Sequence, residues 1–163
     1  MPTSTNPVHR FSASNVQGLA GEARVIEHLE AHGFVVERVA TLREQYEGID
    51  CYASSPKTGE RKRIEIKTDY RAAVTGNAVV ETVSNDQSGR AGWVHTTTAD
   101  WLLYFVPHLD VLYWLRPADL RAALPRWLVE CRAFAAQNVG YRTLGVLVPL
   151  HEFETLAASV VSL

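Results

Sequence analysis

The chain has 163 residues, of which 47% are hydrophobic and 21% are charged, and its formal net charge is -2. These values are typical of one folded domain and exclude fibrous, collagen-like and wholly disordered chains. Two cysteines are too few for a disulfide framework or a four-thiolate zinc site, so we expect a reducing, cytoplasmic environment. No apolar run approaches the roughly 20 residues that a membrane span needs, so no membrane partner is expected.

The beginning of the chain differs in composition from the rest. Residues 1–13 are rich in Thr, Ser, Asn and Pro and lack the apolar stretch of a secretory signal, so we expect a disordered arm on a soluble, unprocessed chain. No internal repeat interrupts residues 14–163, which we expect to form a single domain.

Helices and strands are predicted in the mixed order of a compact α/β domain. A helix from Asn15 to His32 comes first, and Ser14 and Gln17 have the spacing of a capping box at its start. Pro117 and Pro125 each suit the first turn of a helix, which predicts two separate helices. Short apolar and alternating runs predict strands at 34–39, 49–53, 63–68, 78–83, 102–106, 111–115 and 141–148, and the two prolines predict helices at 117–124 and 125–137, with a closing helix at 151–158.

Two neighbouring predicted strands, 49–53 and 63–68, carry side chains suited to catalysis. Alternation places Asp50 on one face of the first strand, and Glu65 and Lys67 on one face of the second. The Pro- and Gly-containing segment between the strands predicts that they pair as a hairpin. One aspartate, one glutamate and one lysine then converge on the same face of the sheet.

Such a group suits the hydrolysis of a phosphodiester bond. Two carboxylates with room for water and a substrate phosphate fit Mg²⁺, which prefers oxygen ligands. An adjacent ammonium can hold the attacking water and offset the charge that builds up on the phosphate. Glu22 borders the helix face that must pack on the sheet, where a carboxylate is costly unless a cation pairs with it, so Glu22 is a further candidate ligand.

The same residues resemble the PD-(D/E)XK nuclease superfamily and look most like its archaeal and phage Holliday-junction resolvase-type members. Ile49 stands where the name of the motif has proline. The similarity covers about residues 14–71 and rests on Gly21-Glu22, Leu29, Gly33-Phe34, Gly48-Ile49-Asp50 and Glu65-Ile66-Lys67. The fold that it implies is α/β, with the αβββαβ core of restriction endonucleases, in which helices flank a mixed central sheet.

The resemblance also implies a role for each residue. Asp50, Glu65 and the backbone carbonyl of Ile66 would bind Mg²⁺ or Mn²⁺, Lys67 would be the lysine of the motif, and Glu22 would be the helical glutamate that resolvase-like members add. The implied activity is that of a DNA endonuclease, selective for branched DNA such as a four-way junction, in recombination and repair. The implied partners are DNA, branched or duplex, and a second copy of the chain in a homodimer.

Further candidates lie outside these motifs. Residues 76–81 and 97–101 are similar to small phage-type nucleases of the same superfamily, which makes Glu81 a further acidic candidate. Arg90 lies in a Gly-flanked loop and is a candidate phosphate ligand, although no sequence signal fixes its direction. The main candidates for contact with DNA are Arg61, Lys62, Arg63, Tyr70 and Arg71.

Several alternatives stay open at this point. Cross-strand ion pairs on a solvated sheet face would explain Asp50, Glu65 and Lys67 without catalysis, and an arginine partner would explain Glu22. The basic cluster also fits a solvated hairpin tip. An exonuclease, a restriction-type nuclease and a non-cleaving nucleic-acid-binding module are alternatives on the same core. Packing is favoured over base stacking for the four tryptophans, and no nucleophile elbow or Gly-rich phosphate loop is present.

Overall fold

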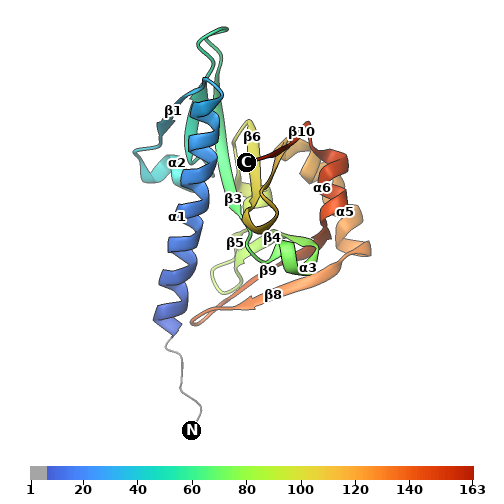
Figure 1. The fold of residues 1–163 in the computed structure, drawn as a ribbon. Coiled ribbons are helices and arrows are strands. Elements are labelled where there is room, and N and C mark those ends of the chain that lie inside the picture. The colour runs from blue at the N-terminus through green and yellow to red at the C-terminus, as the bar shows by residue number, and fades with distance from the viewer. Residues whose placement is uncertain (1–6) are drawn as a thin grey trace.

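A computed structural model describes residues 7–163 and shows a mixed α/β fold built on two β-sheets. Figure 1 shows the long helix α1 along one side of the molecule, with α5 and α6 on the other. The helices are α1 (Pro7–Ala31), α2 (Leu42–Tyr46), α3 (Ala72–Thr75), α4 (Trp93–Thr96), α5 (Pro117–Glu130) and α6 (Leu150–Leu156). The strands are β1 (Val35–Arg38), β2 (Cys51–Ser54), β3 (Arg61–Thr68), β4 (Asn77–Asn85), β5 (Arg90–Ala91), β6 (Trp101–Val106), β7 (Val111–Leu115), β8 (Arg132–Gln137), β9 (Arg142–Pro149) and β10 (Ser159–Ser162).

The larger sheet is six-stranded, in the order β1-β2-β3-β6-β7-β10, and the smaller one is four-stranded, in the order β5-β4-β9-β8. In the larger sheet β3 and β6 run parallel, whereas every other pair is antiparallel. The predicted hairpin of β2 and β3 is confirmed, with Cys51 opposite Ile64 and Tyr52 opposite Arg63. The prediction of a mixed central sheet flanked by helices is therefore confirmed.

Helix α1 covers one face of the larger sheet. Val25, Leu29 and Ile64 are among the buried residues of the core between them. Gly21 allows a close approach, because a Cβ atom at this position would lie 2.3 Å from the side chain of Thr68 at the end of β3. The contact fixes the height of α1 on the sheet and, with it, the position of the next residue, Glu22.

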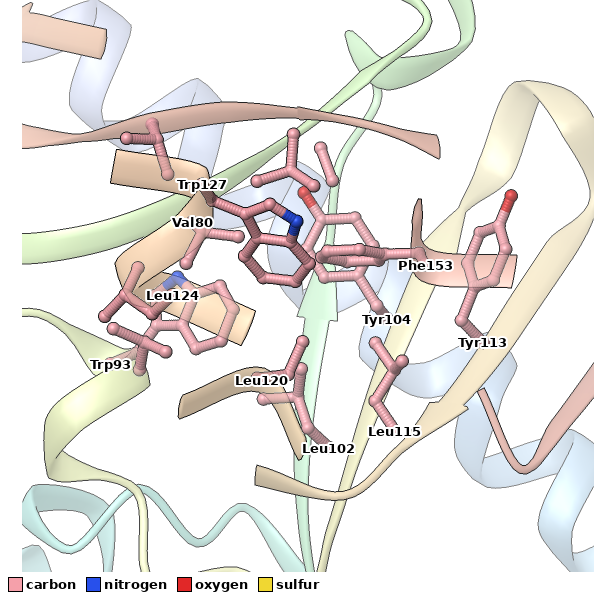
Figure 2. Packing of buried hydrophobic residues seen from close by; sticks show 14 of the residues in the cluster. Val80, Trp93, Leu102, Tyr104, Tyr113, Leu115, Leu120, Leu124, Trp127 and Phe153 are labelled. Atoms are coloured by element: carbon pink, nitrogen blue, oxygen red, sulfur yellow. The ribbon is translucent and has the colours of Figure 1, made fainter. Parts of the chain in front are cut away.

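The opposite face of the larger sheet meets a second core, formed with α5, α6 and the smaller sheet (Figure 2). Phe153 lies edge-on to Tyr104 and Tyr113, with ring centroids 5.0 and 6.0 Å apart. Trp127 is fully buried, and its Nε1–H donates to Glu152 Oε2 at 3.1 Å. This core fixes the smaller sheet against the larger one.

The tryptophans follow the prediction of packing. Trp93 and Trp127 are buried in the second core. Trp101 and Trp114 contact one another edge to face, with ring centroids 6.0 Å apart, and pack against the core under α1. Base stacking is therefore not needed to explain any of the four side chains.

Most of the predicted strands are present, whereas the predicted helix boundaries need correction. The seven strands predicted from sequence are confirmed as β1, β2, β3, β4, β6, β7 and β9. The predicted start of the first helix is wrong, because α1 begins at Pro7 and Ser14 lies inside it rather than at a free N-terminus. Of the predicted arm, residues 1–6 lie outside the described residues and 7–13 are helical.

The second half of the chain differs more. Pro125 lies inside α5 instead of starting a helix, because Leu124 and Trp127 on either side of it are buried and their packing outweighs one lost backbone hydrogen bond. Residues 132–137 form strand β8, which pairs along its whole length with β9. Strand β10, which pairs with β7, was not predicted. No described helix combines the length and apolar character that a bilayer crossing needs.

Candidate active site

The predicted acidic and basic side chains of β3 lie on the face of the larger sheet that meets the smaller sheet. Glu65 and Lys67 are in register with Leu102 and Tyr104 of the parallel strand β6, whose side chains belong to the second core. The Lys67 ammonium binds Glu65 Oε1 at 2.7 Å, and only 4% of the Glu65 side chain is exposed. The Glu65 carboxylate is therefore almost completely shielded from solvent, whereas part of the Lys67 side chain remains exposed.

Asp50 is attached to the same strand by two hydrogen bonds. It lies immediately before β2, and its backbone N–H donates to the Ile64 carbonyl at 2.8 Å. Its Oδ2 accepts from the backbone N–H of Ile66 at 2.7 Å, which holds the carboxylate at the residue between Glu65 and Lys67. The structure therefore brings together the three residues that the sequence predicted would converge, with Ile66 between them.

Glu65 is incompletely satisfied. Its second oxygen, Oε2, is buried and has no hydrogen-bond partner among the described residues. Burial raises the pKa of Glu65, the ammonium of Lys67 and the nearby hydroxyl of Thr97 oppose this, and the charge of Asp50 adds to it. The Thr97 hydroxyl donates its proton to the Gly48 carbonyl, so it leaves Oε2 without a hydrogen bond. A buried carboxylate oxygen without a partner costs on the order of 1–3 kcal/mol, so this position favours either a proton or a cation.

Lys67 keeps its charge in this setting. Burial favours the neutral amine, but the carboxylate of Glu65, assisted by Asp50 and Glu81, more than offsets burial and raises the pKa of Lys67 above its usual range. The side chain is therefore an ammonium at neutral pH. It can donate hydrogen bonds to a water or a phosphate oxygen, and it cannot act as a base there.

A tight turn before β2 positions Asp50. Gly48 has a φ of +69°, and a Cβ atom there would lie 2.9 Å from Thr97 Cα and 3.0 Å from Glu65 Oε2. The Thr97 hydroxyl donates to the Gly48 carbonyl at 3.1 Å, and the Thr98 N–H donates to the Glu47 carbonyl at 2.8 Å. The loop before β6 thus clamps the turn. Sequence analysis missed this role of Thr97, because the contact is long-range.

Glu22 lies on α1 next to the sheet edge. Its Oε1 accepts from Arg38 Nη1 at 2.5 Å, so it has the arginine partner that the alternative interpretation required. Burial and the charge of Asp50 nevertheless raise the pKa of Glu22, against the opposing effect of Arg38. Glu22 is therefore close enough to Asp50 to share its electrostatic environment.

A pocket of about 130 Å³ opens beside the Glu65–Lys67 pair. Glu81 of β4 lines it from the smaller sheet, and Arg90 of β5 and Tyr46 of α2 complete its charged and aromatic wall. Burial raises the pKa of Glu81, with Lys67 acting in the opposite direction. Asp50 and Glu22 lie outside this lining, so the pocket is centred on the Glu65 and Lys67 side of the group.

The predicted DNA-contacting cations at the start of β3 are engaged in ion pairs. Arg61 binds Glu37 at 2.8 Å, and its guanidinium stacks over a tyrosine ring. Lys62 binds Glu60 at 2.6 Å. The backbone N–H, Nε and Nη2 of Arg63 donate to the Asp100 carboxylate at 2.8, 3.2 and 2.9 Å. These pairs support the interpretation of a solvated hairpin, and contact with DNA stays a prediction.

The other two candidates lie beyond the end of β3. The Tyr70 hydroxyl donates to the Gln17 carbonyl of α1 at 3.3 Å, and its ring lies edge-on to His108. Arg71 caps α3, is exposed, and has no carboxylate within 4 Å among residues 7–163. Arg71 is thus the cation of the predicted set whose charge is left unpaired in the described part of the chain.

Among the side chains that the structure describes, no ready-made cage for a metal ion is present, since no three carboxylate, imidazole or thiol groups come together around one point. Any cation bound at this site would take only part of its ligands from acidic side chains. Backbone carbonyls, water and a substrate phosphate would have to supply the rest, as is common for Mg²⁺.

Comparisons with known proteins give little beyond this geometry. No family model and no curated protein matches the chain. The solved structures that are similar include that of the bacterial homing endonuclease I-Ssp6803I, with a TM-score of 0.46 and 18% sequence identity. The similarity covers 64% of this chain and 65% of that one, so the chain spans less than two thirds of its neighbour.

Proposed function

We propose that this protein is a divalent-metal-dependent DNA endonuclease that uses a PD-(D/E)XK-like core. The proposal is carried by one observation. Glu65 is a buried carboxylate with one oxygen on Lys67 and the other without a partner among the described residues, beside Asp50 and at the edge of a polar pocket. A solvated sheet face would not bury such an oxygen, because water would satisfy it.

The residues present fit a hard divalent cation. Asp50, immediately before β2, and Glu65 of β3 would supply carboxylate oxygens, and the Ile66 backbone carbonyl is the proposed third ligand. Glu65 Oε2 has no hydrogen-bond partner among the described residues, so its lone pairs are free to bind a cation. When bound, Mg²⁺ or Mn²⁺ would polarise the phosphate and lower the pKa of a coordinated water.

The side chains themselves have separate tasks in this proposal. Lys67, held as an ammonium by Glu65, donates a hydrogen bond that orients the attacking water and offsets charge on the phosphate. Glu22 is proposed to complete or tune the site from α1, where it is partly buried and bound to Arg38. The water oxygen bonds to phosphorus, the bond to the leaving oxygen breaks, and protons are exchanged with solvent.

The test of the proposal is the Asp50→Asn variant. We expect purified wild-type protein to cut DNA with Mg²⁺ or Mn²⁺ and to be inactive in EDTA, and Asp50→Asn to lose at least about 100-fold in rate. Glu30→Gln, which removes an exposed carboxylate of α1 that does not line the pocket, is the matched control and should keep its activity. Circular dichroism checks that both variants are folded. Full activity of Asp50→Asn would overturn the assignment.

Selectivity for branched DNA and a homodimeric state are proposed on the resemblance of residues 14–71 alone. Cleavage of a four-way junction, a flap, a linear duplex and a single strand should be compared with Mg²⁺ present, and equal cutting of all four would reject structure selectivity. Circular and end-blocked substrates separate this endonuclease from an exonuclease. Sedimentation or light scattering measures the oligomeric state.

A further inference from the structure

Arg90 lines the same pocket as Glu65 and Lys67, a position that the sequence did not predict. It forms the two-residue strand β5 at the edge of the smaller sheet, where it pairs with Asn85 of β4. Gly89 precedes it with a φ of +72°, a conformation that favours glycine and turns the chain back towards β4. The turn brings the Arg90 side chain into the wall of the pocket that also contains Glu65 and Lys67.

The guanidinium of Arg90 is supported by an aromatic ring. Its central carbon lies 4.8 Å from the centroid of the Tyr46 ring. Tyr46 is the last residue of α2, the helix that leads into the Gly48 turn and Asp50. The face of the guanidinium is therefore occupied by the ring, whereas its N–H groups lie in the plane and remain available to an acceptor.

Arg90 also differs from Lys67, the other cation that lines the pocket, and from the predicted DNA-contacting cations at the start of β3. Arg61, Lys62 and Arg63 each have a carboxylate partner, and the charge of Lys67 is matched by Glu65. Within residues 7–163, Arg90 has no carboxylate within 4 Å. Of the two cations that line the pocket, Lys67 forms an ion pair and Arg90 forms none with the described residues.

We propose that Arg90, supported by the ring of Tyr46, binds a backbone phosphate of the DNA strand next to the bond that is cut. The inference rests on the proposed nuclease function and adds a residue for substrate binding. A planar guanidinium donates two parallel hydrogen bonds to the oxygens of a phosphate, which fixes the orientation of the strand as well as its position. Tyr46 is a positioning residue, because it acts through Arg90.

The alternative is a surface stacking contact with no substrate. Such a contact contributes only modestly to stability at an exposed site and would leave DNA kinetics unchanged when it is removed. The two interpretations therefore differ in KM and in the dependence of binding on salt. Neither quantity would respond to a purely structural role.

The experiment measures kcat, KM and the salt dependence of DNA binding for Arg90→Gln, Arg90→Lys and the wild type, with binding measured in Ca²⁺. We expect Arg90→Gln to raise KM about tenfold with a smaller change in kcat, and to reduce the slope of log affinity against log salt by about one. Arg90→Lys, which keeps the charge and loses the planar fork, should restore the salt slope and only part of the affinity.

The control is Arg132→Gln, because Arg132 is an exposed arginine of β8 that does not line the pocket. It should leave both KM and the salt slope at their wild-type values. Tyr46→Leu should raise KM, and Tyr46→Phe, which keeps the ring, should rescue most of the loss.

The outcomes separate this inference from the proposed function. If the wild type cuts DNA and Arg90→Gln has the KM and salt slope of the wild type, the role of Arg90 is overturned while the nuclease stands. A rise in KM shared equally by Arg90→Gln and Arg132→Gln also overturns it, because the effect would then be one of general surface charge. If the wild type cuts no DNA with any divalent metal, the proposed function fails and this inference fails with it.

Discussion

Two ion pairs start from the same strand and have opposite character. Arg63 near the start of β3 gives Asp100 three hydrogen bonds, and both side chains are partly exposed. Lys67 near the end of β3 gives Glu65 a single close contact, while Glu65 Oε2 stays buried without a partner in the described residues. Both carboxylate oxygens of Asp100 accept hydrogen bonds, whereas only one oxygen of Glu65 has a partner in the described residues.

The pKa values of the two acids move in opposite directions for this reason. Hydrogen bonds from Arg63 lower the pKa of Asp100, against a smaller opposing effect of burial. Burial dominates at Glu65 and raises its pKa despite the neighbouring ammonium. An ion pair whose atoms all have hydrogen-bond partners stabilises the fold. A pair with one unpartnered buried oxygen carries a desolvation cost, and a ligand that binds this oxygen would remove that cost.

Replacing Glu65 and Asp100 by their amides is the strongest test of the difference between the two ion pairs. Glu65→Gln should lower the cleavage rate by at least about 100-fold while the protein stays folded, because it removes the proposed metal-binding charge. Asp100→Asn should keep the cleavage rate within a few-fold and lose about 1 kcal/mol of the free energy of unfolding. Cleavage assays and urea unfolding measure both. The comparison fails if Asp100→Asn loses as much activity as Glu65→Gln.

The turn before Asp50 gives the second test. Gly48→Ala should cost about 1–3 kcal/mol of the free energy of unfolding, since the new Cβ meets Thr97 in a left-handed backbone conformation. Gly59→Ala is the matched control, because Gly59 has a φ of +72° but no atom within 4 Å of the added Cβ. Thermal unfolding measures both, and an equal loss in the two variants would attribute the whole effect to backbone conformation.

The pH dependence of stability sharpens the contrast further. Because the pKa of Glu65 is raised in the folded state, its protonated form is favoured there, and its contribution to stability falls as the pH rises above its ordinary value of 4.5. Glu65→Gln should therefore gain stability relative to the wild type as the pH rises from 4.5 towards 7. Urea unfolding at several pH values measures the difference.

Glu152 provides the control with the opposite sign. Hydrogen bonds from Arg126 and Trp127 lower the pKa of Glu152 from 4.5 to about 2. Its stabilising contribution is present above pH 4.5 and is lost as the pH falls towards 2. Glu152→Gln should lose stability relative to the wild type as the pH rises over this range. Equal signs for the two variants would contradict the assignment of the two environments.

The smallest effect concerns the thiols. Burial, with the charges of Asp50 and Glu22, raises the pKa of Cys51 to about 12. Cys51 should therefore resist a thiol reagent at pH 8 until the protein unfolds, whereas the half-buried Cys131 should react in the native state. Labelling with and without urea, read by mass spectrometry, measures this. Rapid native labelling of Cys51 would show that the core under α1 opens more easily than its packing indicates.

The sequence predicted the local part of the site and little of its surroundings. Alternation was enough to place Asp50, Glu65 and Lys67 together, because β2 and β3 are joined by a short turn. Thr97 and Arg90 could not be placed, since their contacts join segments distant in the chain, and only the packed sheets bring them to the pocket.

The errors in secondary structure have the same origin. Pro125 has the sequence signature of a helix start, but burial of its neighbours in the second core keeps α5 continuous. Strands β8 and β10 carry weak local signals and form because β9 and β7 offer them free edges. Tertiary pairing overrides local preference at each of these places.

The parallel pairing of β3 with β6 has a consequence for how the chain acquires activity. Unlike the β2–β3 hairpin, it joins two strands separated by residues 69–100, and this segment includes β4, which itself pairs with the distant strand β9. Loops of this length carry an entropic cost that must be met before their contacts form. We therefore expect cleavage to recover late during refolding, after most of the helical signal has returned.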